Sequence, residues 1–181
     1  MPNKISGRVA LCGVLGALML AVMLLGTMLP LATYACPTLA GAMSIPVIWE
    51  LGPKPGWLLY LAVSLLSLFM APDKEAAFLF LFLLGWYPIL RPKLQHIRKR
   101  PVRVLVKLVI FNLTILLMYA LLLFVLVMPD LQAEAAGWTG LLLAAMLLLG
   151  NVAFLLYDLL LARMTDLYVY RLRPKLFPRH F

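Results

Sequence analysis

The sequence predicts an all-α integral membrane protein, a single bundle of six transmembrane helices, on three observations. Of its 181 residues, 65% are hydrophobic and 13% are charged, whereas soluble domains are about half apolar and a quarter charged. The apolar residues form six segments, most of them near the roughly 20 residues that a helix needs to cross a bilayer. These segments are apolar on all sides, which excludes the alternating pattern of a membrane β-barrel. The expected helices cover residues 9–29, 31–51, 56–71, 76–94, 104–128 and 137–162, and a basic tail covers 163–181.

The first three helices differ in how their ends are marked. The first lacks a charge and stops at Pro30, and its apolar run is longer than the core of about 7–15 residues found in a signal peptide. We therefore expect it to stay in the protein. The second contains Pro37 and Pro46, which remove backbone donors and should kink it. The third is short and ends before the charged turn at 72–75.

The last three helices are joined by two loops, one long and basic and the other short. The fourth has Pro88 near its end, and it leads into a strongly basic loop that extends from Arg91 to Lys107. The fifth and sixth are joined by the short loop 129–136. Nothing in the sequence marks a second domain, a long linker or an internal repeat.

The positive charges predict the orientation. Cytoplasmic loops of membrane proteins carry an excess of Lys and Arg. If both termini are cytoplasmic, every Lys and Arg except Lys74 falls on the cytoplasmic side, whereas an odd number of helices would place one of the two basic clusters outside. The net charge of +9 then faces anionic lipid headgroups. Nucleic acid is not expected as a partner, since stacking aromatics and a soluble domain are missing.

The motifs of common enzyme sites are missing from the sequence. His96 and His180 lie in basic segments outside the expected helices, and neither belongs to an H-E-x-x-H motif. There is no G-x-S-x-G and no Walker A motif. Cys12 and Cys36 fit neither a disulfide framework nor a metal site. We expect no enzyme activity, no metal and no cofactor.

Small residues recur every four positions on the first helix, at Gly13, Ala17 and Ala21. This spacing places them on one helix face, where another helix can approach closely. The face either packs inside the bundle or forms a groove for a partner protein.

Polar residues near the outer side are the candidates for a substrate site. The turn Asp73-Lys74-Glu75 is either a solvated helix cap or the polar rim of a pocket. Tyr34 and Tyr119 fall in the outer halves of their helices. The candidate substrate-binding residues are Thr33, Tyr34, Asp73, Lys74, Glu75, Tyr119 and Asn151.

Three polar residues lie deep in the last two helices. Asn112 and Asn151 can supply hydrogen bonds between helices, or Asn151 can contribute to the pocket. Asp158 is costly in lipid unless it is paired, neutral or facing water. We expect it to pair with a base such as Lys107, as a structural contact or to shape the inner face for a partner. We assign Asn112 and Asp158 to structure.

The pattern of about 180 residues, six helices, short loops and cytoplasmic ends resembles the substrate-binding S component of energy-coupling factor (ECF) transporters. Ala17 and Ala21 match the A-x-x-x-A face of that family's first helix, and 150–158 is similar to its last helix. The resemblance implies a plasma-membrane subunit that binds a vitamin or other micronutrient from outside. It further implies a transmembrane coupling subunit that docks on Gly13, Ala17 and Ala21, and ATPase subunits supplied by other chains. The alternative is a multi-pass scaffold or accessory subunit without a small-molecule ligand.

Overall fold

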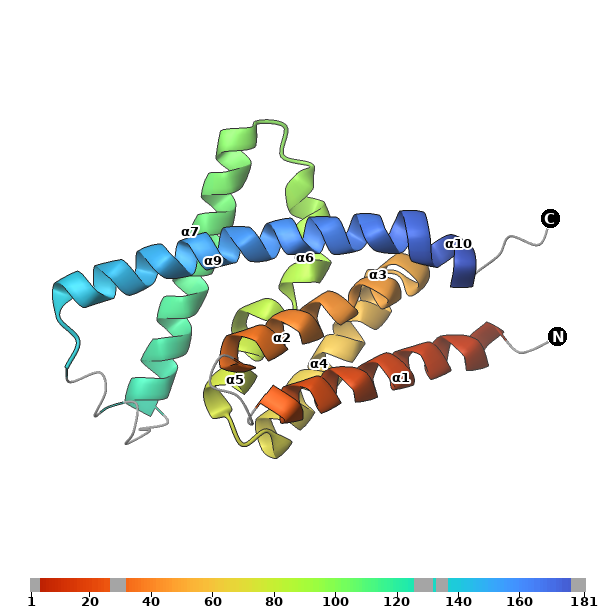
Figure 1. Ribbon diagram of the computed structural model, residues 1–181, viewed down its shortest axis with the longest axis horizontal. Coiled ribbons are helices and arrows are strands. Elements are labelled where there is room, and N and C mark those ends of the chain that lie inside the picture. Colours follow the sequence, from red (N-terminus) through yellow and green to blue (C-terminus); the bar gives the residue numbers. More distant parts are fainter. Residues whose placement is uncertain (1–3, 27–31, 126–131, 133–136, 177–181) are drawn as a thin grey trace. The chain divides into compact units, whose positions relative to one another are not determined.

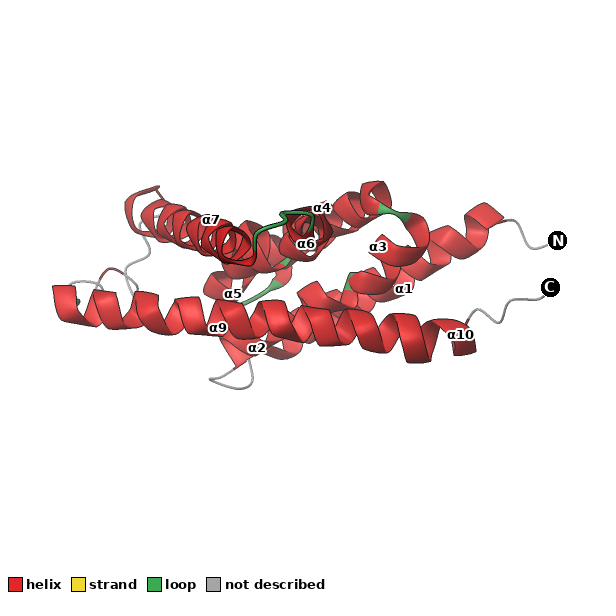
Figure 2. Ribbon diagram, turned by 90° about the horizontal axis from the view of Figure 1, so that it is seen from above, coloured by secondary structure: helices red, strands yellow, loops and turns green. Residues whose placement is uncertain are grey.

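The computed structural model describes residues 4–26, 32–125, 132 and 137–176. In these residues the chain is helical, interrupted by short turns and without a strand (Figure 1, Figure 2). The first part contains α1 (Lys4–Leu25), α2 (Ala32–Met43), α3 (Ile45–Leu51), α4 (Pro53–Met70), α5 (Lys74–Leu79), the π-helical η2 (Phe80–Leu84) and α6 (Tyr87–Gln95). The second part contains α7 (Arg100–Ala120), η3 (Leu121–Val125), α9 (Gly140–Leu167), η4 (Tyr168–Leu172) and α10 (Arg173–Leu176).

Five helical stretches of the described chain are long and apolar enough to cross a membrane. They are Gly7–Leu25, Pro53–Met70, Lys74–Gln95, Arg100–Phe124 and Gly140–Leu172. The all-helical class and the membrane-compatible helices are therefore confirmed. The expected loop at 129–136 lies outside the described residues, apart from residue 132.

The segment 31–51, expected as one kinked helix, is divided into α2 and α3. Pro46 has no N–H to donate to the carbonyl four residues earlier, so the helical ladder is interrupted there. The buried Ser44 occupies the break, and its hydroxyl donates to the carbonyl of Gly41 at 2.7 Å. With 12 and 7 residues, neither helix alone reaches across a hydrocarbon core of about 30 Å. The sixth crossing stays a prediction.

The stretch expected at 76–94 is also divided, into α5, η2 and α6. Pro88 cannot donate a backbone hydrogen bond, and the turn at 85–86 separates η2 from α6. Two side chains bond carbonyls of the π-helical turn: the Tyr60 hydroxyl donates to Leu81 O at 2.6 Å, and the Trp86 indole donates to Phe82 O. These bonds satisfy polar backbone groups in an apolar surrounding.

The last helix is longer than the expected 137–162. Helical structure continues through α9 and η4 to Leu172 and through α10 to Leu176. The chain has no proline between 140 and 173, and a helix satisfies its own backbone in lipid and in water alike. The beginning of the expected basic tail is therefore helical.

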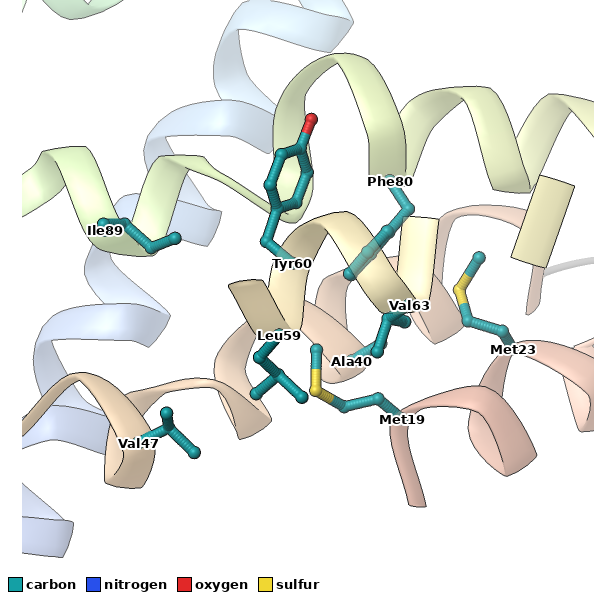
Figure 3. Close-up of a cluster of buried hydrophobic side chains, with 9 residues drawn as sticks. All are labelled: Met19, Met23, Ala40, Val47, Leu59, Tyr60, Val63, Phe80 and Ile89. Carbon is teal, nitrogen blue, oxygen red and sulfur yellow. The ribbon is translucent and has the colours of Figure 1, made fainter. Parts of the chain in front are cut away.

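Contacts divide the chain into two compact units, Met1–Pro92 with Leu160–Phe181, and Lys93–Leu159. In the first unit, α1 packs against α2 and α4, α3 packs against α4, and α2 packs against α5 and η2. Figure 3 shows the side chains that form the core between these helices. The cluster comprises Met19, Met23, Ala40, Val47, Leu59, Tyr60, Val63, Phe80 and Ile89.

Two glycines allow close packing in this core. A Cβ at Gly16 of α1 would lie 3.1 Å from Leu59 Cδ1, and one at Gly56 of α4 would lie 3.1 Å from Ile48 Cγ1. Gly52, with φ of +93°, forms the tight link between α3 and α4, and Pro53 then starts α4 at a position that suits proline.

Gly85 offers a test of the packing at η2. A Cβ there would lie 2.7 Å from Tyr60 Cδ2 and 2.8 Å from the carbonyl oxygen of Phe80. We expect Gly85→Ala to lower the free energy of unfolding by about 1–3 kcal/mol through overpacking. Thermal unfolding in detergent micelles measures the loss.

Gly7→Ala is the matched control, because a Cβ at Gly7 meets no atom within 4 Å. Alanine there should leave stability unchanged or raise it by up to about 1 kcal/mol. Equal unfolding temperatures for Gly85→Ala and the unmodified protein would contradict the close packing.

Candidate functional site

The small residues of α1 lie on its exposed side. Gly13, Ala17 and Ala21 are exposed, whereas Met19 and Met23 are buried in the core. A Cβ at Gly13 would meet no atom within 4 Å. Residues four apart share one face of a helix, so α1 presents one face to the core and the small residues on another. The sequence left two interpretations of this face, packing inside the bundle or a groove for a partner protein. Among the described residues, packing inside the bundle does not account for its exposure.

The charged turn before α5 bonds mainly to the ends of its neighbouring helices. The Asp73 carboxylate accepts from Ala76 N at 3.1 Å, as an N-cap does. Lys74 Nζ donates to Leu68 O at 2.9 Å and to Ala71 O at 3.0 Å. Asp73 therefore caps the beginning of α5, and Lys74 donates hydrogen bonds to carbonyls at the end of α4. For these two residues the geometry matches the cap interpretation.

Tyr34 and Glu75, both candidate substrate residues, are joined by a side-chain hydrogen bond. The Tyr34 hydroxyl donates to Glu75 Oε1 across 3.4 Å, near the upper limit for a hydrogen bond. Tyr34 is 56% exposed. Thr33 is half-buried one residue earlier on α2. This pair connects α2 to α5 and keeps polar atoms accessible.

The other candidate substrate residues belong to the second unit. Tyr119 packs edge-on against Trp138, with ring centroids 6.1 Å apart. Asn112 Nδ2 donates to Asn151 Oδ1 at 2.8 Å, and Asn151 Nδ2 donates back at 3.2 Å. Each amide also donates to the carbonyl four residues earlier, on Leu108 and Leu147. Asn151 is therefore joined to Asn112, the arrangement expected of an interhelical contact.

Lys107 and Asp158 form an ion pair in the second unit. Lys107 Nζ lies 2.6 Å from Asp158 Oδ2, and the two side chains are 6% and 19% exposed. The pairing expected from the sequence is present. Both charges lie on helices compatible with membrane crossing, where each alone would be costly. Their attraction joins the beginning of α7 to α9.

Aromatic packing lies between the ion pair and the amide pair along the sequence. The rings of Phe111 and Phe154 stack with centroids 4.9 Å apart and an interplanar angle of 21°. A Cβ at Gly150 would lie 3.1 Å from the Phe111 ring, so the glycine lets this ring approach α9. On α7 the buried residues Lys107, Phe111 and Met118 follow spacings of four and seven, which place them on one face.

A third polar cluster, in the first unit, was not predicted. Glu50 Oε1 accepts from the Tyr168 hydroxyl at 3.1 Å and from Arg173 Nε at 2.8 Å. Glu50 lies near the end of α3, while the other two residues follow α9. More than a hundred positions separate Glu50 from its two partners, so no local sequence pattern indicates the contact. The one available signal was that Glu50 is an isolated acid at the end of an apolar segment.

The described residues contain no group of three or more His, Cys, Asp or Glu side chains arranged to hold a metal ion. Comparison of this chain with protein families, with curated proteins and with solved structures finds no match. The function is therefore inferred from the exposed face of α1 and from the polar contacts of the two units.

The ion pair yields a stability test. Asp158→Asn should leave the Lys107 ammonium buried without its charge partner and cost about 3–5 kcal/mol of folding stability. The double variant Lys107→Met with Asp158→Leu removes both charges and should recover most of that loss. Unfolding in mixed micelles measures both values.

Asp166→Asn is the control, because it removes an exposed carboxylate further along α9. It should change stability by less than about 0.5 kcal/mol. The ion-pair interpretation fails if Asp158→Asn and Asp166→Asn behave alike.

Proposed function

We propose that this chain is a membrane-embedded, substrate-binding subunit similar to the S components of ECF transporters. The observation that supports the proposal best is the two-sided character of α1. Its core side carries Met19 and Met23, while Gly13, Ala17 and Ala21 are exposed. An exposed stripe of small side chains, flanked by the exposed Val14 and Leu18, allows the backbone of another transmembrane helix to approach closely. In this proposal a coupling subunit docks there, and separate ATPase subunits drive uptake.

The proposed topology has six crossings with both termini in the cytoplasm of the plasma membrane. Five crossings correspond to the membrane-compatible stretches, and α2 with α3 supplies the sixth. This arrangement leaves Lys74 as the one lysine or arginine of the sequence on the outer side. Lys and Arg usually lie on the cytoplasmic side, and Lys74 is an exception in this topology. Its ammonium is stabilised there by hydrogen bonds to carbonyls at the end of α4.

The proposed ligand is a vitamin or other small micronutrient taken from the outer side. Its proposed contacts are the exposed Tyr34 and the half-buried Thr33 and Glu75. The Tyr34 hydroxyl and the Glu75 carboxylate already bond each other, and both are groups that can donate to or accept from a polar ligand. Asp73 and Lys74 contribute by fixing the turn. Tyr119 and Asn151, the other candidate residues from the sequence, belong to the second unit and are not part of this set.

A multi-pass scaffold without a ligand is the second candidate. This candidate is favoured because polar side chains within α7 and α9 bond to one another. Asn112 bonds Asn151, and Lys107 bonds Asp158, so these groups contribute to holding α7 and α9 together. A scaffold would use the exposed face of α1 for a partner in the same way, and the ligand separates the two candidates.

The docking role of α1 is tested by bulky substitutions. Ala17→Trp and Ala21→Trp should each abolish co-purification of a transmembrane partner assembled with Walker A ATPases, because an indole prevents close helix approach. Leu65→Trp is the control, since Leu65 is an exposed apolar residue of α4 outside the proposed face. Retention of such an assembly by both alanine variants would exclude docking through this face.

The ligand is tested separately by native mass spectrometry of the protein purified gently from its own membrane. We expect a small molecule to co-purify and to be lost in Tyr34→Phe combined with Glu75→Gln. The control is Thr139→Val, which changes an exposed residue beside α9 and should retain the molecule. If the partner assembly is captured while no small molecule is bound across preparations, the scaffold interpretation replaces the substrate-binding one.

A further inference from the structure

The segment that leads into α7 concentrates positive charge without a carboxylate nearby in the sequence. We refer to Arg98, Lys99, Arg100 and Arg103 as the basic turn. The first three are exposed and Arg103 is half-buried. No Asp or Glu occurs between residues 92 and 108, and none of the four forms an ion pair among the described residues. The charges of the basic turn are therefore available to an external anion.

The position of the basic turn makes its charges unfavourable for the isolated helix. Lys99 is the N-cap of α7, its side chain forms no capping hydrogen bond, and the first turn contains no acid. The beginning of a helix carries partial positive charge and favours anions, whereas cations there repel it. An anion bound to the basic turn would reverse this effect.

Arg103 adds a donor that is already desolvated. Its Nε is withdrawn from solvent and has no hydrogen-bond partner among the described residues. A buried N–H without an acceptor is costly, so a ligand oxygen that reached it would recover that cost. Guanidinium groups match the geometry of phosphate oxygens, which accept bidentate, charge-assisted hydrogen bonds.

The same helical turns expose apolar side chains beside the cations. Val102, Leu105 and Val109 are 42%, 62% and 57% exposed, and they lie in the membrane-compatible stretch Arg100–Phe124. A free phosphate ion would make no use of this surface. Nucleic acid would require aromatic side chains for stacking, and residues 93–110 contain no Phe, Tyr or Trp. A lipid offers both a phosphate and acyl chains.

We propose that the basic turn at the beginning of α7 is a binding site for an anionic phospholipid. The phosphate contacts Arg98, Lys99, Arg100 and the Nε of Arg103, and the acyl chains lie along Val102 and Leu105. The bound headgroup neutralises the cations at the helix terminus and holds this end of α7 at the membrane surface. The site is independent of the proposed transport function.

The test is a lipid titration of the full chain in detergent, followed by native mass spectrometry. Phosphatidylglycerol should bind at least about tenfold more tightly than phosphatidylcholine with the same acyl chains, because each surface cation contributes roughly fivefold to attraction for anionic lipid and the basic turn has four. The triple variant Arg98→Gln, Lys99→Gln, Arg100→Gln should lose about tenfold or more of this affinity. Arg103→Gln should weaken it as well, and Arg103→Lys should weaken it less.

The matched control removes three exposed cations from other helices, in Arg8→Gln, Lys54→Gln, Arg163→Gln. It should retain phosphatidylglycerol affinity within about twofold, because attraction between a cation and a lipid headgroup falls off within a Debye length. Equal losses in both triple variants would overturn the proposal in favour of diffuse attraction to the surface. The proposal would also be overturned if glycerol 3-phosphate displaced phosphatidylglycerol as strongly as the lipid itself does. Tighter binding of a single-stranded oligonucleotide than of phosphatidylglycerol would overturn it as well. Unfolding temperatures in phosphatidylcholine micelles check that the exposed substitutions leave the fold intact.

Discussion

For a chain with five helical stretches long and apolar enough to cross a membrane, the absence of water in the hydrocarbon layer is the main physical constraint. A polar group there must bond within the protein or remain at a cost of several kcal/mol, about the scale of a whole domain's stability. The described residues meet this constraint in two ways, with the buried Ser64 Oγ as an exception. Short polar side chains bond back to their own helices, as Thr114 does to Ile110 O and Thr165 to Leu161 O. Longer ones reach a second helix, as Lys107 does to Asp158.

Prolines lie beside the breaks in regular helix, and side chains bond backbone carbonyls close to these breaks. Pro46 and Pro88 each remove a backbone donor, and each lies beside a break, at Ser44 and at 85–86. The Ser44 hydroxyl and the Tyr60 hydroxyl supply hydrogen bonds at these places. Tyr60 therefore has two roles, because its ring belongs to the apolar core while its hydroxyl bonds the π-helical turn. The packed core and the broken helices of the first unit are linked through this side chain.

The sequence predicted the helical class because hydrophobic length alone determines it, and it predicted the Lys107–Asp158 pair because an isolated acid in an apolar helix needs a nearby base. It predicted kinks at Pro37 and Pro46, but it did not predict which proline would lie at a break. The sequence alone does not distinguish Pro37 from Pro46 and Pro88. The helix α2 continues through Pro37, whereas breaks lie beside the other two prolines. Which proline ends a helix depends on the packing around it. The Glu50 cluster was missed for a related reason, since contacts over long sequence separations leave no periodic pattern.

The candidate substrate residues divide according to how strongly they are already bound. Asp73, Lys74 and Asn151 have short bonds to helix ends or to another amide, and a ligand would have to replace these bonds one for one. Tyr34 and Glu75 share a bond of 3.4 Å at an exposed position. Exchange is least costly where the existing bond is long and water already competes for it. In the proposed function, the ligand therefore lies against Tyr34 and Glu75, next to the turn that Asp73 caps.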